Sequence, residues 1–267
     1  MRNRNLICVT VVMCVTTVLS AALPTKGVRY VTEGDAYRLG QCTLDLHIPV
    51  ETGFPTVVWL HGGGLVEEDG RPVRISEDIG QAVVRYRLMT HENGLQGADC
   101  IRDAAEAVAW TLKHIADYGG DPRKVFVSGY SAGGYLAMMV GMDGRYLAEH
   151  GVKTTDIAGL VPISGQATRH FNVRRYAGDK DPSAMPKVDE LAPLKYCTKD
   201  MPPILSVCGE PPYEWPGRSE ENRLLIGSCT ALGHRKARFV QLPYCDHGRV
   251  VDAAFPFLEF FVRGRLP

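Results

Sequence analysis

Hydrophobic residues form two kinds of segment along this chain, and the two kinds alternate. Short continuous apolar runs are typical of strands that are buried on both faces of a parallel sheet. Longer segments place apolar residues three and four positions apart, which is typical of helices with one buried face. The segment from 98 to 118 has this helical spacing. Its apolar positions are Ile101, Ala104, Ala105, Val108, Leu112 and Ile115.

The alternation predicts an α/β fold with a doubly wound, mostly parallel sheet and helices on both faces. Predicted strands cover 44–49, 55–60, 82–86, 124–128, 159–163, 203–208 and 238–242. Predicted helices cover 98–118, 132–142, 219–232 and 252–262. The stretch between Ser164 and Cys197 is rich in Pro, Asp and Arg and has no clear period. We expect it to form a short loop or cap over one end of the sheet.

The N-terminus has the three parts of a secretory signal peptide. Arg2 and Arg4 precede an apolar run at 6–19, and small residues follow at 20–22. The run is shorter than the ~20 apolar residues that a membrane-spanning helix needs. We therefore predict a signal peptide at 1–22 and one domain at 23–267. The mature protein would be exported, periplasmic or secreted, and would not be membrane-bound.

Charge and cysteine content narrow the choice of partners. The 30 basic and 30 acidic residues balance, so nothing favours nucleic acid as a partner. Six cysteines would remain after signal cleavage, and in an oxidising compartment some could pair, but the sequence does not choose among the connectivities. They are Cys42, Cys100, Cys197, Cys208, Cys229 and Cys245. Because no Cys or His spacing fits a metal site, no metal is expected.

A G-x-S-x-G motif lies directly between a predicted strand and a predicted helix. Its residues are Gly129, Tyr130, Ser131, Ala132 and Gly133. A serine on such a sharp turn is held in strained backbone, and the flanking glycines let the turn close. The start of the following helix favours a developing negative charge. The motif predicts Ser131 as a nucleophile.

A glycine run, His61-Gly62-Gly63-Gly64, follows the predicted strand at 55–60. Bare glycines expose backbone N–H groups that can bind the oxyanion of a tetrahedral intermediate. An ordinary glycine-rich turn is the alternative interpretation. We interpret His61 as a residue that fixes the loop.

His247 follows the last predicted strand, where the histidine of a Ser–acid–His triad is expected. The acid should follow the strand at 203–208, and two residues there qualify, Glu210 and Glu214. Glu214 is the favoured acid because it lies farther from the strand end, where its side chain can reach back to His247. Glu210 is the alternative acid. Asp246 is a poor candidate because neighbouring side chains on an extended segment point apart.

An ordered set of motifs resembles the α/β-hydrolase esterases over nearly the whole chain after residue 22. The motifs are HGGG at 61–64, YRL at 86–88, DAAEAVAW at 103–110, YGGDP at 118–122 and GYSAGG at 129–134. More narrowly, the chain resembles an exported branch related to bifunctional feruloyl and acetyl-xylan esterases and to hormone-sensitive-lipase-like esterases.

The resemblance implies roles for individual residues. Ser131 would be the nucleophile, His247 the general base, and the N–H groups of Gly63, Gly64 and Ala132 the oxyanion hole. Asp103 would be structural. The chain departs from its relatives after the strand at 203–208, where their usual G-D-x-D or G-D-x-E becomes a segment with proline at 212. This departure is a second reason to assign the acid to Glu214.

The implied function is a serine carboxylic-ester hydrolase that works through an acyl-enzyme and needs no cofactor. By family analogy its substrate is a small-molecule or carbohydrate ester with an acetyl or feruloyl group. The alternatives are hydrolysis of another acyl bond (amide, lactone or peptide) and a non-catalytic binding protein on the same fold. Four residues flank the motifs and either line the pocket or pack in the core. They are Leu65, Tyr130, Tyr135 and Trp215.

Overall fold

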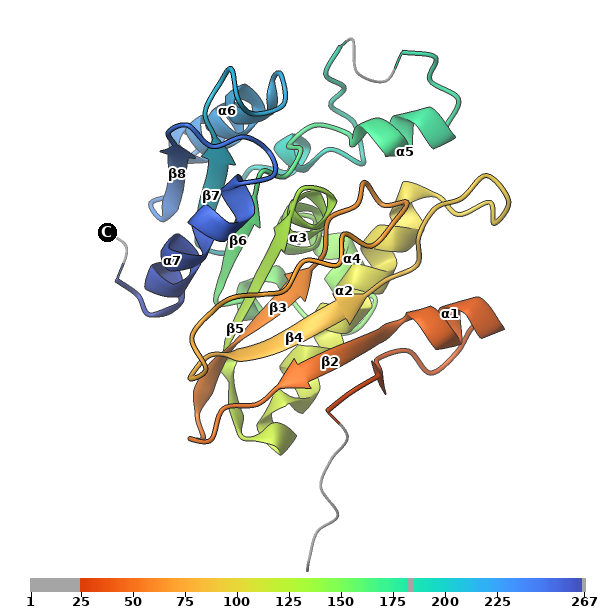
Figure 1. The fold of residues 1–267 in the computed structure, drawn as a ribbon, viewed down its shortest axis with the longest axis vertical. Coiled ribbons are helices and arrows are strands. Elements are labelled where there is room, and N and C mark those ends of the chain that lie inside the picture. Colours follow the sequence, from red (N-terminus) through yellow and green to blue (C-terminus); the bar gives the residue numbers. More distant parts are fainter. Residues whose placement is uncertain (1–24, 182–184, 266–267) are drawn as a thin grey trace, which may run out of the picture.

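The computed structural model describes residues 25–181 and 185–265, so the predicted signal peptide lies outside the described residues. Eight strands form one sheet in the order β1-β2-β4-β3-β5-β6-β7-β8 (Figure 1). Their bounds are β1 Val28–Arg29, β2 Thr43–His47, β3 Phe54–Leu60, β4 Gly80–Arg85, β5 Gly120–Tyr130, β6 Gly159–Ile163, β7 Ile204–Gly209 and β8 Ala237–Leu242. β2 runs antiparallel to β1 and β4, and every other neighbouring pair is parallel. The predicted mostly parallel sheet is confirmed.

The four predicted helices are present with shifted ends. They are α2 Gly97–His114, α3 Ala132–Met142, α6 Arg218–Ala231 and α7 Val250–Val262. The predicted helix at 98–118 is in fact two helices, because the α-helix ends at His114 and a 3-10 turn, η1 Ile115–Tyr118, continues to Gly119. Gly119 ends it with a φ of 88°, a left-handed conformation that favours glycine.

Shorter helices were not predicted. They are α1 Ala36–Gln41, α4 Gly144–Ala148, α5 Phe171–Tyr176, η2 Thr154–Asp156 and η3 Pro193–Tyr196. Each is too short for a periodic apolar pattern to be visible in the sequence.

The sheet is covered on both faces, as the alternation predicted. Successive side chains of a strand point to opposite faces, so β3 supplies two separate hydrophobic clusters. Val58 and Leu60 pack in the cluster that includes α2, α3 and α6 residues. Val57 and Trp59 pack in the other cluster, with α7. Both β3 faces are buried, which explains why this strand is apolar without interruption.

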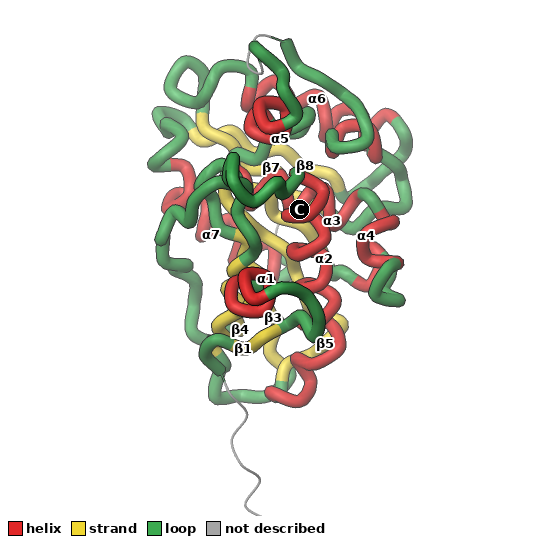
Figure 2. Tube along the Cα trace, turned by 90° about the vertical axis from the view of Figure 1, so that its right-hand side faces the viewer, coloured by secondary structure: helices red, strands yellow, loops and turns green. Residues whose placement is uncertain are grey.

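The segment between β6 and β7 forms the predicted cap, and it contains α5 and η3. Figure 1 shows α5 beyond the arrowheads of the parallel strands, and Figure 2 shows loops covering the same end. Asn172 ties this segment to the glycine run by donating from Nδ2 to the Gly64 carbonyl at 2.8 Å. Tyr135 of α3 donates to the Leu191 carbonyl at 2.8 Å. These bonds hold the cap over the carboxyl ends of the strands.

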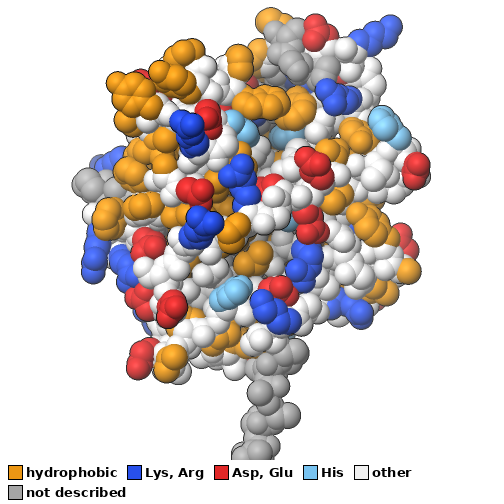
Figure 3. Space-filling model, viewed as in Figure 1, with side chains coloured by type: hydrophobic (Ala, Val, Ile, Leu, Met, Phe, Trp, Pro, Cys, Tyr) orange, Lys and Arg blue, Asp and Glu red, His pale blue; other side chains and the backbone are white. Residues whose placement is uncertain are grey.

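Surface charge, helix hydropathy and the state of the cysteines each bear on a prediction from the sequence. On the face drawn in Figure 3, acidic and basic side chains are interspersed. Within residues 25–181 and 185–265, no helix is long and apolar enough to cross a membrane. The six cysteines of this part of the chain are all free thiols.

Candidate active site

Ser131 lies on the turn between β5 and α3, and its backbone is strained. Its φ of 55° and ψ of −115° are uncommon for a residue with a side chain. Its N–H donates to the Ile163 carbonyl at 2.8 Å, which fixes the turn against β6. A Cβ on Gly133 would lie 1.9 Å from the Leu60 carbonyl oxygen, so only glycine fits there. The G-x-S-x-G residues therefore form the sharp turn that the sequence predicted.

His247 joins Ser131 to a carboxylate. Its Nε2 lies 2.9 Å from Ser131 Oγ, and its Nδ1 lies 2.6 Å from Glu214 Oε1. A carboxylate only accepts, so Nδ1 carries the proton and Nε2 is free to accept from the serine hydroxyl. Ser131, Glu214 and His247 follow β5, β7 and β8, whose carboxyl ends meet at one edge of the sheet.

The Glu214 carboxylate is buried and accepts four hydrogen bonds. Besides His247, it accepts from the Trp215 N–H at 2.8 Å, the Ser164 hydroxyl at 2.5 Å and the Gly209 N–H at 3.3 Å. Burial alone would raise the pKa of this carboxyl group. The hydrogen bonds, that from His247 foremost, outweigh burial and lower the pKa to about 2. Glu214 is thus ionised at neutral pH.

The two acids that the sequence left open have different positions. Glu210 Oε2 accepts from the Tyr244 N–H at 3.0 Å and braces the loop after β8. The structure thus brings Glu214 to His247 and places Glu210 elsewhere. Asp246 accepts from the Arg249 N–H at 2.8 Å in the turn before α7.

The glycine run lies beside Ser131 with open N–H groups. Gly63 and Gly64 line the same cavity as Ser131, with φ of 91° and 64°. Among the described residues, no acceptor bonds the N–H groups of Gly63, Gly64 or Ala132. An oxyanion near Ser131 is the kind of group that these donors can bind.

Neighbouring residues fix the glycine run. The Gly62 N–H donates to Asp69 Oδ2 at 2.8 Å. His61 Nδ1 lies 2.7 Å from the Gly62 carbonyl oxygen, and its ring stacks on Tyr86 at 4.2 Å. Burial lowers the pKa of His61, which favours its neutral form. These contacts hold His61 within the loop, and it does not line the cavity that holds Ser131 and His247.

The cavity at Ser131 has a volume of about 310 Å³ and an aromatic wall. Phe171 and Trp215 stack with ring centroids 5.6 Å apart, and Trp215 lies 5.6 Å from the His247 ring. Tyr130 also lines the cavity and donates to the His247 carbonyl at 2.5 Å. Of the four flanking residues, Tyr130 and Trp215 thus line the pocket, whereas Leu65 and Tyr135 are core residues with no exposed surface.

Sequence reasoning missed several residues of this cavity. Phe171 and Asn172 come from the cap segment, where the sequence has no period. Arg218 is the first residue of α6, and Arg71 lies in the long loop after β3. Nothing in the sequence near these residues marks them, because they reach the site only through tertiary packing.

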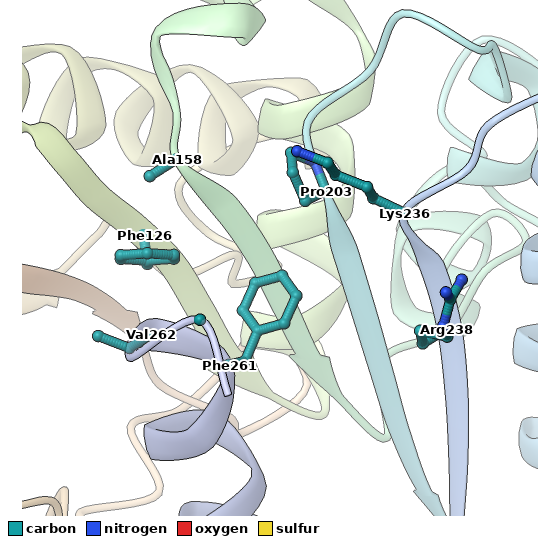
Figure 4. A pocket seen from close by; sticks show the side chains of 8 residues that line it. Phe126, Ala158, Pro203, Lys236, Arg238, Phe261 and Val262 are labelled. Atoms are coloured by element: carbon teal, nitrogen blue, oxygen red, sulfur yellow. The ribbon is translucent and has the colours of Figure 1, made fainter. Parts of the chain in front are cut away.

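A second cavity, of about 420 Å³, lies at the amino ends of the same strands (Figure 4). Its lining residues include Ala158, Pro203 and Lys236, just before β6, β7 and β8, and Phe126 of β5, which pairs with the first residue of β6. Ser131 and His247 follow the carboxyl ends, so this cavity is at the opposite end of the sheet. In the described part of the chain, no cluster of three or more His, Cys, Asp and Glu residues is placed to hold a metal ion.

Comparisons with known proteins agree with this architecture. The solved structure of Thermogutta terrifontis esterase 2 phosphoramylated by tabun has a TM-score of 0.67 at 20% identity, covering 91% of this chain and 97% of that one. A truncated carbohydrate esterase from gut microbiota has a TM-score of 0.69 at 17% identity, covering 90% and 94%. The α/β-hydrolase fold predicted from the motifs is thereby confirmed.

The match between this chain and its curated relatives covers only part of each relative's length. Mouse (Mus musculus) liver carboxylesterase 1 is 33% identical over 106 residues, which is 34% of this chain and 19% of that protein. Mouse carboxylesterase 1D is 31% identical over 157 residues, 47% of this chain and 28% of that protein. The matched part of this chain therefore spans 19% to 28% of the length of these two relatives. The BD-FAE family model matches residues 44–211, more than half of the chain. By that match, the chain belongs to the BD-FAE family.

Proposed function

We propose that this protein is a serine carboxylic-ester hydrolase. The observation that carries the proposal is the chain of hydrogen bonds from Ser131 through His247 to the ionised Glu214. A serine is a weak nucleophile at its free pKa and needs an adjacent base, and the base needs a third group to orient it. In this protein we assign Ser131 as the nucleophile, His247 as its base and Glu214 as the group that orients the base.

Hydrolysis proceeds in two acyl transfers. Ser131 Oγ attacks the ester carbonyl carbon while His247 Nε2 takes the hydroxyl proton. The bond to the alkoxy oxygen then breaks, and His247 returns the proton to that oxygen as the alcohol leaves. Water attacks the resulting acyl-serine with His247 again as base, and release of the acid restores the Ser131 hydroxyl. Glu214 stabilises the imidazolium that forms in each step.

The oxyanion of each tetrahedral intermediate binds to the N–H groups of Gly63, Gly64 and Ala132. These donors are free of protein acceptors in the described residues, and the loop that carries two of them is fixed by Asn172 and Asp69. Preorganised donors of this kind are worth about 10²–10³-fold in kcat each.

The proposed substrates are acetyl or feruloyl esters of carbohydrates or small alcohols. The support is membership of the BD-FAE family and the similarity in fold to a carbohydrate esterase from gut microbiota. The aromatic wall of Phe171 and Trp215 offers a surface on which a sugar or phenolic ring can lie. We further propose that the chain acts outside the cytoplasm after loss of residues 1–22.

The first test is hydrolysis of 4-nitrophenyl acetate by the protein and by two serine variants. Ser131→Ala removes the nucleophile and should lower kcat by about 10⁶-fold. Ser228→Ala changes a serine of α6 outside the cavity and is the matched control. Equal turnover by Ser131→Ala and the unaltered protein would overturn the proposal. Acetylated xylan and methyl ferulate then compare the two acyl groups.

A further inference from the structure

Arg218 is a buried cation in the wall of the cleft. It begins α6, is 5% exposed and lines the cavity that holds Ser131 and His247. It also lines an adjoining cavity of about 350 Å³, which shares Phe171 and Trp215 with the first. The two cavities thus meet at the aromatic pair and at this guanidinium.

Most of the hydrogen-bonding capacity of Arg218 is unused by the protein. A guanidinium has five N–H donors. Within the described residues, the one acceptor that bonds it is the Ser164 carbonyl oxygen. No carboxylate oxygen of those residues lies within 4.0 Å of its nitrogens. Burying a charge without a partner is costly, and here burial lowers the pKa of the arginine.

Two carboxylates, Glu214 and Glu221, lie near enough for their charges to act on Arg218, and both already accept hydrogen bonds from other groups. Glu214 accepts from His247, Ser164 and two backbone N–H groups, as described above. Glu221 accepts from the N–H groups of Ala167 and Thr168 at 3.1 and 3.2 Å and from the Thr168 hydroxyl at 3.0 Å. Neither acid is placed to pair with the guanidinium.

Three other charged residues line the catalytic cavity. Asp69 accepts from the Gly62 and Arg71 N–H groups, and Glu67 is exposed. Arg71 is exposed and donates to the Gly248 carbonyl at 2.9 Å. Charges of both signs are therefore present at the mouth of the catalytic cavity. Of the two arginines that line it, Arg218 is the one that is buried. The buried charge of Arg218 is not part of a generally positive surface, because acidic and basic side chains are interspersed over the face drawn in Figure 3.

We propose that Arg218 binds a carboxylate carried by the ester substrate. This inference rests on the proposed esterase function and names a substrate class for it. A carboxylate can accept two parallel N–H bonds from a guanidinium, which supplies the missing partner. The alkoxy oxygen of the ester must face His247, and Trp215, whose ring contacts His247, lines the adjoining cavity together with Arg218. The carboxylate is therefore on the alcohol part, as in an acylated hexuronate sugar whose ring lies on Phe171 and Trp215.

The test uses substrate pairs that differ in charge. One pair is a methyl O-acetyl-hexuronoside and the matching O-acetyl-hexoside, in which a hydroxymethyl group replaces the carboxylate. A second pair carries the carboxylate on the acyl part, 4-nitrophenyl hemisuccinate against 4-nitrophenyl butyrate. We expect kcat/KM of the full chain to favour the charged member of the first pair by about 10- to 100-fold, the size of a charge-assisted hydrogen bond.

Two variants assign the preference to one residue. Arg218→Gln removes the charge and should bring the charged-to-neutral ratio close to one. Arg71→Gln removes the exposed cation at the cleft mouth and should leave the ratio within about threefold, as expected for a solvent-screened charge. The ratio is the readout because loss of the bond to Ser164 would slow both substrates of a pair.

Each outcome decides between the alternatives. No preference for either charged substrate by the unaltered protein overturns the proposal, whether or not Arg218→Gln folds. A preference confined to the hemisuccinate moves the carboxylate to the acyl part and overturns the placement. A ratio that follows Arg71 and not Arg218 overturns the assignment. Failure of the esterase function itself is separate, since 4-nitrophenyl acetate would then not be hydrolysed in a Ser131-dependent way.

Discussion

Ser164 donates a hydrogen bond from its hydroxyl to Oε2 of Glu214 at 2.5 Å, on the side of the carboxylate away from His247. The backbone of Ser164 is itself held in place, with a φ of 46° and an N–H that donates to the Val207 carbonyl at 2.8 Å. Its carbonyl oxygen accepts from Arg218. The end of β6 thus fixes the orientation of an acid that follows β7.

From this contact we expect Ser164→Ala to lower kcat for 4-nitrophenyl acetate by about 10- to 100-fold, because a hydrogen bond to a charged group is lost. KM should change little, since Ser164 does not line the cavity. The matched control is Ser206→Ala, a buried serine of β7 that bonds Asn222 at 2.7 Å. If both variants lose the same activity, Ser164 has only a structural role.

The two acids of the loop after β7 should differ strongly when each is made neutral. Glu214→Gln removes the charge that orients His247 and stabilises its imidazolium, and kcat should fall by about 10³–10⁴-fold. Glu210→Gln removes a charge that does not reach His247 and keeps an oxygen that can accept from the Tyr244 N–H, so kcat should stay within about threefold. Steady-state rates with 4-nitrophenyl acetate measure both. The reverse ranking would move the triad acid to Glu210.

The choice between these acids shows where the sequence stops being informative. Chain order placed the acid in the loop after β7, and distance from the strand end favoured Glu214 but left Glu210 as the alternative. The N–H groups of Tyr213 and Glu214 both bond the Glu210 carbonyl, at 2.8 and 3.1 Å, so this loop is a helical turn. That turn places Glu214 beside His247, and its start is held by a distant segment, since the Glu210 N–H donates to the Cys245 carbonyl at 3.3 Å.

The fold was predictable for a different reason. Strands such as β3 and β5 are buried on both faces, so their apolar runs are visible without knowledge of their neighbours. The motifs at Ser131 and at the glycine run require particular residues at fixed spacing, as the 1.9 Å approach at Gly133 illustrates. Arg218 and Asn172 have no such local requirement. They contribute through positions set by the cap and α6, and only the structure places them at the site.

Two glycines at the start and in the interior of helices, Gly133 of α3 and Gly227 of α6, should respond oppositely to alanine. Gly133→Ala would put Cβ 1.9 Å from the Leu60 carbonyl oxygen, and neither backbone can move away. We expect a loss of more than about 4 kcal/mol in the free energy of unfolding, or no soluble protein. Gly227 lies inside α6 with open space around it. Gly227→Ala should gain about 0.5–1 kcal/mol.

Urea denaturation followed by circular dichroism measures both changes. A Gly133→Ala protein as stable as the unaltered one would show that the turn at Ser131 can open to admit a side chain. A loss of stability in Gly227→Ala would show that the surface of α6 is covered.

His170 should make stability depend on pH. Its side chain is fully buried, stacks on Phe171 at 4.5 Å and accepts from the Asn172 N–H through Nδ1 at 3.2 Å. Burial, aided by the positive charge of Arg218, lowers the pKa of His170 to about 3. The unfolded chain protonates the same residue near pH 6.5. Unfolding therefore takes up a proton between these values, and the free energy of unfolding falls as the pH drops from about 6.5 toward 3.

The variant His170→Asn keeps a side-chain acceptor at the start of α5 and removes the titrating group. Between pH 7 and pH 5, the unaltered protein should lose about 2 kcal/mol more than this variant, from one proton taken up below pH 6.5. Urea unfolding curves of both proteins at the two pH values measure the difference, and contributions from other residues cancel. Equal losses would mean that His170 becomes protonated in the folded protein at pH 5, and that its surroundings are more open to water than its burial indicates.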